Sequence, residues 1–201
     1  MVGNAPRVAV APGSERSFSP NGDDQEDTAT VSYCVSAAAT VTASITADDG
    51  SPVRTLEPAE VTGGLACNSW NNSVAWDGKD DAGKVVTAGV YTLRLHAVDA
   101  GGRTGDASVR LGVDPRIPGA LTSPAAGETL AGLARFVFQP TSGFGLDEVQ
   151  LSFDTGGSAR IFNASPDGTW RTSMYTGDLK DGPTSLRMAV RFSDSFGATH
   201  W

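Results

Sequence analysis

The sequence has few of the residues on which catalysis and metal binding most often depend. It holds only two histidines, His96 and His200, and two cysteines, Cys34 and Cys67. Neither histidine stands in the spacing of a zinc site or of a nucleophile and its base, and GxSxG, HExxH and phosphate-binding loops are absent. We therefore expect no catalytic site within these residues.

Positive charge and long apolar runs are also scarce. Fifteen lysines and arginines stand against 23 acidic residues, which gives a net charge of −8 and argues against nucleic acid as a partner. No run approaches the roughly 18 apolar residues of a membrane helix. The opening stretch MVGNAPRV lacks the apolar core of a secretory signal peptide. The sequence therefore predicts no membrane span.

What the sequence does contain is typical of an all-β protein. Hydrophobic residues at 39% are enough for a core, and 24 glycines and 11 prolines suit many short strands and turns. Apolar and polar residues alternate, and no window of 11 residues shows a convincing 3.6-residue period. The predicted inward rows of the first half are Val31, Tyr33 and Val35; Val41, Ala43 and Ile45; Tyr91, Leu93, Leu95 and Ala97; and Val109, Leu111 and Val113.

Two prolines, Pro115 and Pro118, predict a domain boundary just after the strand that ends near Val113. They cannot continue a strand ladder and favour a stiff, extended link. We expect one β-sandwich at 1–114 and another at 115–201. The predicted inward residues of the second are Phe136, Phe138, Val149, Leu151, Phe153, Leu186, Met188, Val190 and Phe192.

The last strand of the second sandwich is expected to be missing or only begun. The first sandwich has a further strand, at 107–113, after its Asp99 turn, whereas only 198–201 are available after Asp194. An open sheet edge pairs readily with another chain. We therefore expect self-association to fall when native residues are added there.

The first half resembles the FlgD-type immunoglobulin-like domain over about residues 17–113. The resemblance rests on Phe18-Ser19-Pro20-Asn21-Gly22-Asp23, Trp76-Asp77-Gly78 and Ala88-Gly89-Val90-Tyr91. Asp24 and Glu26 depart from the pattern, since the family commonly has Gly and Asn there. The second half resembles bacterial Ig-like modules through TSPAAGETLAG, LDEVQLSFD and LKDGPTSLRMAV.

The resemblance implies a non-catalytic spacer or adhesion module from a secreted or cell-surface bacterial protein. Its partners would be the neighbouring domains of a larger parent and a protein or polysaccharide. Two other functions stay open: a carbohydrate-binding module, and the accessory region of a secreted peptidase or glycosidase whose active site lies outside this chain. An extracellular location also favours a disulfide between Cys34 and Cys67, against the alternative of two free thiols.

The acidic loop at 19–27 is a candidate for a weak calcium site. Asn21, Asp23 and Asp27 offer the oxygen ligands that calcium prefers, helped by backbone carbonyls. Asx residues also form turns by binding their own backbone, which is the competing interpretation. Asp24 replaces a glycine that would permit a positive φ, so the loop is strained or takes another path. No other cofactor is expected.

Two further groups are interpreted mainly as structural. The second acidic cluster, at Asp77, Asp80 and Asp81, is typical of a solvated hairpin turn. Trp76 shares parity with Val74 and is predicted to lie in the core. Trp70 lies in the polar run CNSWNNS and is the tryptophan expected to be exposed, where it could contact a sugar.

Overall fold

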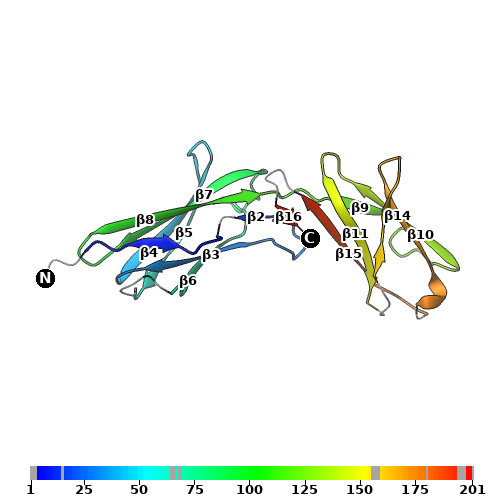
Figure 1. The fold of residues 1–201 in the computed structure, drawn as a ribbon, viewed down its shortest axis with the longest axis horizontal. Helices are drawn as coiled ribbons and strands as arrows, with labels where there is room; N and C mark the ends of the chain where they lie inside the picture. Colours follow the sequence, from blue (N-terminus) through cyan, green and yellow to red (C-terminus); the bar gives the residue numbers. More distant parts are fainter. Residues whose placement is uncertain are drawn as a thin grey trace. The chain divides into compact units, whose positions relative to one another are not determined.

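The computed structural model describes residues 4–14, 16–63, 67, 69–154, 159–179, 181–193 and 198–200. The chain divides into two compact units, Met1–Arg116 and Ile117–Trp201, and both are built from strands (Figure 1). The single helical element of the described part is a 3-10 turn, η1 (Thr176–Asp178). The prediction of an all-β protein is therefore confirmed.

The first unit is a sandwich of a three-stranded and a five-stranded sheet. The smaller sheet has the order β1-β3-β6, and the larger has the order β2-β8-β7-β4-β5. Neighbouring strands are antiparallel except β2 and β8, which run parallel. The strands are β1 (Val8–Val10), β2 (Arg16–Phe18), β3 (Ala29–Val35), β4 (Ala39–Ala47), β5 (Pro52–Val61), β6 (Asn72–Trp76), β7 (Gly89–Val98) and β8 (Thr104–Val113).

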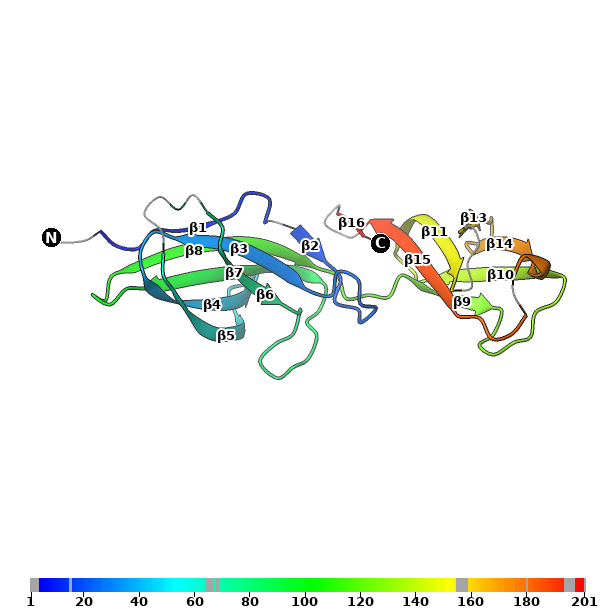
Figure 2. The same ribbon diagram turned by 90° about the horizontal axis from the view of Figure 1, so that it is seen from below.

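The two sheets of the first unit face each other across one apolar core (Figure 2). The alternating rows predicted from the sequence supply most of it, because successive side chains of a strand point to opposite faces. Leu93, Leu95, Ala97 and Leu111 are fully buried, and the rows on β3 and β4 are buried as well. These rows are confirmed.

The second unit is a sandwich of two four-stranded sheets. Their orders are β13-β14-β10-β9 and β12-β11-β15-β16. The strands are β9 (Gly119–Ser123), β10 (Leu133–Pro140), β11 (Gly145–Phe153), β12 (Arg160–Ile161), β13 (Asn163–Ala164), β14 (Trp170–Tyr175), β15 (Leu186–Ser193) and β16 (Thr199–His200).

The core of the second unit contains four phenylalanines, Phe136, Phe138, Phe153 and Phe162, with residues of β11 and β14. The predicted row on β15 is only partly buried. Phe192 is buried, Met188 and Val190 are half-buried, and Leu186 is 37% exposed. Among the described residues β16 pairs with β15 only at Phe192 and Ser193. The rest of that edge of β15 has no neighbouring strand in the described part, which explains the weaker burial.

Candidate functional site

The three sequence motifs of the first half meet at one end of the first sandwich. Each contributes one aromatic ring: Phe18 from the first motif, Trp76 from the second and Tyr91 from the third. The Phe18 and Trp76 ring centroids lie 5.5 Å apart, and those of Trp76 and Tyr91 lie 5.3 Å apart, both edge to face. This is the preferred geometry of aromatic pairs. All three rings are buried, so the prediction that Trp76 lies in the core is confirmed.

The glycine of the second motif permits this packing. Gly78 has φ +69°, which side chains rarely adopt, and a Cβ added there would overlap the ring of Pro20. Trp76 donates its indole N–H to the carbonyl oxygen of Lys79 at 2.9 Å. The chain therefore turns tightly after β6 and closes against the first motif.

The third motif forms a turn that is held by its tyrosine. The Tyr91 hydroxyl donates to the carbonyl oxygen of Thr87 at 2.9 Å. A tyrosine near the start of a strand that bonds the backbone a few residues upstream is the tyrosine corner of Ig-like sandwiches. The motif thus fixes the chain where it enters β7.

The first motif is also joined to the end of β8. The Ser19 hydroxyl donates to the carbonyl oxygen of Asp114 at 2.8 Å. The fully buried carboxylate of Asp114 accepts two hydrogen bonds from the guanidinium of Arg116, at 2.8 and 2.6 Å. Bidentate pairing compensates the cost of burying the charge. These contacts fix the path of the chain as it leaves the first sandwich.

The carboxylates of the acidic loop bind the backbone of the loop itself. Asp27 accepts from the N–H groups of Gly22 and Asp24 at 2.8 and 2.9 Å. Asn21 accepts from the N–H of Asp23 at 3.1 Å, and Asp23 accepts from the N–H of Gln25 at 2.9 Å. The bonds of Asn21 and Asp23, each to the N–H group two residues further along the chain, form Asx turns. The three predicted calcium ligands therefore also serve as the hydrogen-bond acceptors that shape the loop.

The two departures from the family pattern occupy strained positions. Asp24 has φ +65° and Glu26 has φ +51°, where Gly and Asn are the residues best tolerated. In the described part of the chain no three His, Cys, Asp or Glu side chains are grouped as metal ligands. Calcium binding through Asn21, Asp23 and Asp27 stays a prediction.

The second acidic cluster lies in the turns between β6 and β7. Asp80 accepts from the N–H groups of Ala82 and Lys84, at 3.0 and 2.9 Å. Asp77 pairs with Arg54 at 2.5 Å. Asp80 shapes a turn, as interpreted from the sequence, and Asp77 in addition joins its turn to β5.

Cys34 and Cys67 form a disulfide with a Cα–Cα distance of 5.3 Å. Cys34 lies on β3, beside the inward row, and is 2% exposed. The bond holds Cys67 against the outer face of the smaller sheet. A small cavity of about 120 Å³ next to the bond is lined by Thr62, Ser69 and Asn71, among others.

Trp70 is 40% exposed and follows the disulfide segment. Its exposure agrees with the sequence prediction, whereas its contact with a sugar stays a prediction. Trp201 lies outside the described residues.

The two histidines have different surroundings. His96 on β7 lies 2.9 Å from Asp106 on β8, whose carboxylate also accepts from Arg94 at 2.8 Å. His200 is buried, with its ring 5.2 Å from that of Phe192. His96 thus takes part in an exposed cross-strand charge group, and His200 in packing.

In the part of the chain that the structure describes, four carboxyl groups have a lowered pKa. The N–H of Arg103, its guanidinium and the N–H of Gly101 lower the pKa of Asp99 in the β7–β8 turn. His96 and then Arg94 lower the pKa of Asp106. Hydrogen bonds from Ser51 lower the pKa of Asp49, and hydrogen bonds from Thr169 lower that of Asp167. Hydrogen bonds to the ionised form favour it in each case.

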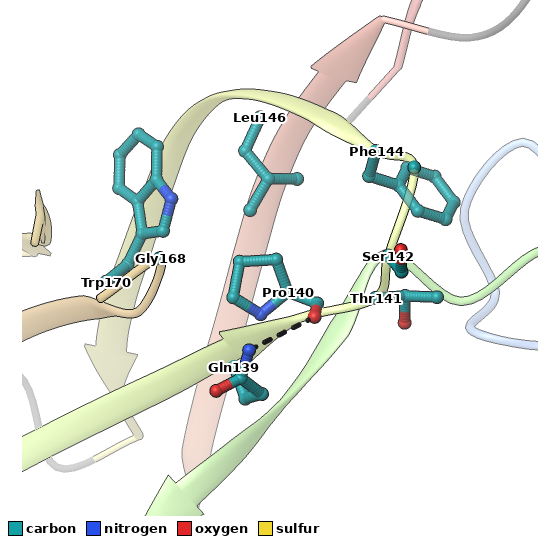
Figure 3. Close-up of a pocket in the computed structure, with 9 residues that line it drawn as sticks. Gln139, Pro140, Thr141, Ser142, Phe144, Leu146, Gly168 and Trp170 are labelled. Atoms are coloured by element: carbon teal, nitrogen blue, oxygen red, sulfur yellow. Dashed lines mark hydrogen bonds between the residues drawn. The ribbon is translucent and has the colours of Figure 1, made fainter. Parts of the chain in front are cut away.

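The second unit has an open pocket of about 370 Å³ that the sequence did not predict (Figure 3). Figure 3 shows the Trp170 indole and the Phe144 ring at opposite ends, with Pro140 and Leu146 between them. Gln139 lies at the rim. The pocket combines the β10–β11 turn with the turn before β14. Because about 25 residues separate these turns in the sequence, no local motif could reveal their meeting.

A comparison with protein-family models finds a match within the first unit. Residues 17–101 match the family model described as FlgD Ig-like domain. No curated protein matches the chain. None of the helices in the described residues is long and apolar enough to cross a membrane.

Solved structures resemble the chain only distantly. A tetra-tandem repeat from the extending region of a large adhesion protein is 18% identical, with a TM-score of 0.35, and covers 97% of this chain and 47% of its own. A structure of chicken CNTN1 FN1–FN3 domains is 9% identical (TM-score 0.39; 98% and 62% covered). A 1.5-MDa bacterial ice-binding adhesin is 16% identical (TM-score 0.32; 96% and 60% covered). The chain spans less than two thirds of each.

Proposed function

We propose that the chain is a non-catalytic Ig-like spacer of a secreted or cell-surface protein, because residues 17–101 of the first unit match the FlgD Ig-like domain model. It positions neighbouring domains of a larger parent and presents its sheet faces and loops to a partner.

One observation supports this role above the others: the side chains of the three motifs take part in core packing and in turn formation. Phe18, Trp76 and Tyr91 are buried against one another. Gly78 has no room for a side chain beside Pro20, and the Tyr91 hydroxyl binds the backbone. Residues that served catalysis would instead point into a cleft. The motifs build a stable module, which is what a spacer needs.

Two features support an extracellular location and a stiff link. The Cys34–Cys67 disulfide is typical of an oxidising environment. Arg116, which binds buried Asp114, stands between Pro115 and Pro118, which favour an extended chain. A spacer of two modules needs a stiff link because only such a link keeps the domains on either side of it at a constant separation.

The spacer role is tested by fusing a donor fluorescent protein before Met1 and an acceptor after Trp201. Single-molecule energy transfer should show one narrow distribution of separations. Replacing Pro115 and Pro118 by glycine should broaden that distribution, because glycine frees the backbone. A matched control, Trp70→Ala, should leave it unchanged. A broad distribution in the wild-type chain would contradict the proposal.

Carbohydrate binding is the second candidate, and the exposure of Trp70 favours it. A tryptophan presents a large flat surface on which a sugar ring can stack. The wild-type chain should then be retained on insoluble polysaccharide, and Trp70→Ala should weaken that retention. Retention that is unchanged in Trp70→Ala would remove Trp70 from the candidate site.

A further inference from the structure

The pocket of the second unit is walled by aromatic rings that the structure holds in place. Trp170 opens β14 and is half-buried against the core. Phe144 packs edge to face on Phe192, with ring centroids 5.0 Å apart. The two walls are therefore rigid, which lowers the entropic cost of binding a ligand between them.

The turn before β14, one of the two turns that form the pocket, is also fixed by hydrogen bonds. The turn before β14 has bonds from Ser165 N–H to Thr169 O at 2.8 Å and from Gly168 N–H to Ser165 O at 2.9 Å. Asp167 accepts from the Thr169 N–H and hydroxyl and pairs with Arg171. This turn sets the position at which Trp170 enters the pocket.

The rim of the pocket is polar but uncharged. Gln139 donates its Nε2 to the carbonyl oxygen of Pro140 at 3.4 Å, which leaves its Oε1 as an acceptor (Figure 3). Thr141 and Ser142 are exposed and add two hydroxyl groups. Among the described residues that line the pocket, none is ionisable. The lining therefore suits a neutral ligand with many hydroxyl groups and offers no partner for a charged one.

We propose that this pocket binds a neutral saccharide, with one sugar ring lying on the indole of Trp170 and its hydroxyls bonded to Gln139, Thr141 and Ser142. The volume of about 370 Å³ lies within the range of small-ligand sites. The pocket is open to solvent, so a polysaccharide chain can pass through it rather than being enclosed. This role goes beyond the spacer function and does not depend on Trp70.

The experiment titrates the whole chain with short neutral oligomers of β-1,4-linked glucose, β-1,4-linked xylose and α-1,4-linked glucose. Tryptophan fluorescence and calorimetry report binding. A neutral oligomer should bind saturably, whereas a galacturonate oligomer should not. Trp170→Ala should weaken binding by about tenfold or more. Gln139→Ala should weaken it by about two- to tenfold, the equivalent of one hydrogen bond.

Two further variants separate a lost contact from a lost fold. Trp170→Tyr keeps an aromatic face and should retain most of the affinity, while removing the fluorescence change if Trp170 is its source. Trp70→Ala leaves the pocket intact and should bind as the wild type does. Thermal unfolding of each variant verifies that the second unit is folded.

Three results would overturn the proposal. The first is that no neutral oligomer binds at millimolar concentration. The second is that Trp70→Ala abolishes binding while Trp170→Ala does not, which would move the site to the first unit. The third is that galacturonate or a peptide binds and the neutral oligomers do not. The spacer role would survive all three, because the energy-transfer experiment measures separation and not binding.

Discussion

The two units use the tryptophans of their strands, Trp76 and Trp170, in opposite ways. Trp76 ends β6 and is buried between Phe18 and Tyr91. Trp170 begins β14 and is half-buried at an open pocket. Trp76 is enclosed by Phe18 of β2 and Tyr91 of β7, whereas Trp170 adjoins the two turns that form the pocket. Whether a tryptophan on a strand becomes core or lines a pocket thus depends on the segments that pack against it.

The same contrast holds for the strands β7 and β15. β7 has β4 on one side and β8 on the other, with ten residue pairs to β8. β15 has β11 on one side, and in the described part of the chain β16 covers only two positions on the other. Leu93 and Leu95 are therefore fully buried, whereas Met188 is half-buried.

The largest expected effect concerns the two tryptophans. Trp76→Ala should lower the free energy of unfolding of the first unit by about 3–5 kcal/mol, the usual cost of emptying a buried aromatic site. Trp170→Ala should cost the second unit about half of this or less, because less area is buried. Unfolding in urea, monitored by amide hydrogen exchange, measures the free energy of unfolding of each unit separately. Equal costs would contradict the comparison, and Trp70→Ala serves as an exposed control.

Reduction of the disulfide should destabilise only the first unit. The bond closes a segment with a sequence separation of 33, and its loss should cost about 2–4 kcal/mol. Calorimetry with and without reductant measures the effect. The second unit contains neither cysteine, so its transition is an internal control. Two free thiols in the denatured, unreduced protein would show that the bond does not form.

Acid should weaken the first unit more than the second. Asp49, Asp99 and Asp106 of the first unit and Asp167 of the second have lowered pKa values. The folded state therefore binds fewer protons than the unfolded state near these values. The stability that these groups contribute is complete above the unfolded pKa of about 3.9 and is lost as the pH falls through the folded pKa.

Denaturation of both units from pH 6 to about pH 2 measures this dependence. Asp99→Asn should make the stability of the first unit fall less steeply with decreasing pH, because it removes one of the carboxyl groups with a lowered pKa. A larger loss of stability at low pH in the second unit than in the first would contradict the prediction.

A smaller effect is expected in the acidic loop. Asp24→Gly should raise the stability of the first unit by about 0.5 kcal/mol, because glycine adopts φ +65° without strain. Asp24→Ala keeps the Cβ and should bring no such gain. Differential scanning calorimetry of the two variants tests this, and an equal rise for both would exclude relief of strain as the cause.

The smallest expected effect is that of calcium. If Asn21, Asp23 and Asp27 bind calcium weakly, millimolar calcium should raise the melting temperature of the first unit by mass action. Asp23→Ala should remove that increment. The second unit should not respond. Identical melting curves in calcium and in chelator would leave the loop as a set of Asx turns.

Features that repeat along a strand could be predicted from the sequence. The inward rows on β3, β4 and β7 follow directly from alternation, and parity with Val74 placed Trp76 in the core. The strain at Asp24 was also predictable, because the comparison with the family pattern marked a glycine position.

Features that depend on separate turns could not be predicted. The pocket around Trp170 exists because the β10–β11 turn and the turn before β14 lie next to each other. The sequence of one turn does not indicate that the other turn lies beside it. The exposure of Leu186 was missed for a related reason. Its row follows the alternating pattern, but burial depends on the strand beside it, and the pattern of β15 alone does not reveal that neighbour.

The parallel pairing of β2 with β8 has a consequence for a module under tension. Arg16 pairs with Leu111 and Phe18 with Val113, so the start of β2 and the end of β8 lie at opposite ends of the ladder. A pull on the chain before β2 and after β8 loads these hydrogen bonds together along the strand direction. They must break at once rather than one after another. Ser19, bonded to Asp114 at the same end, adds to this resistance to stretching.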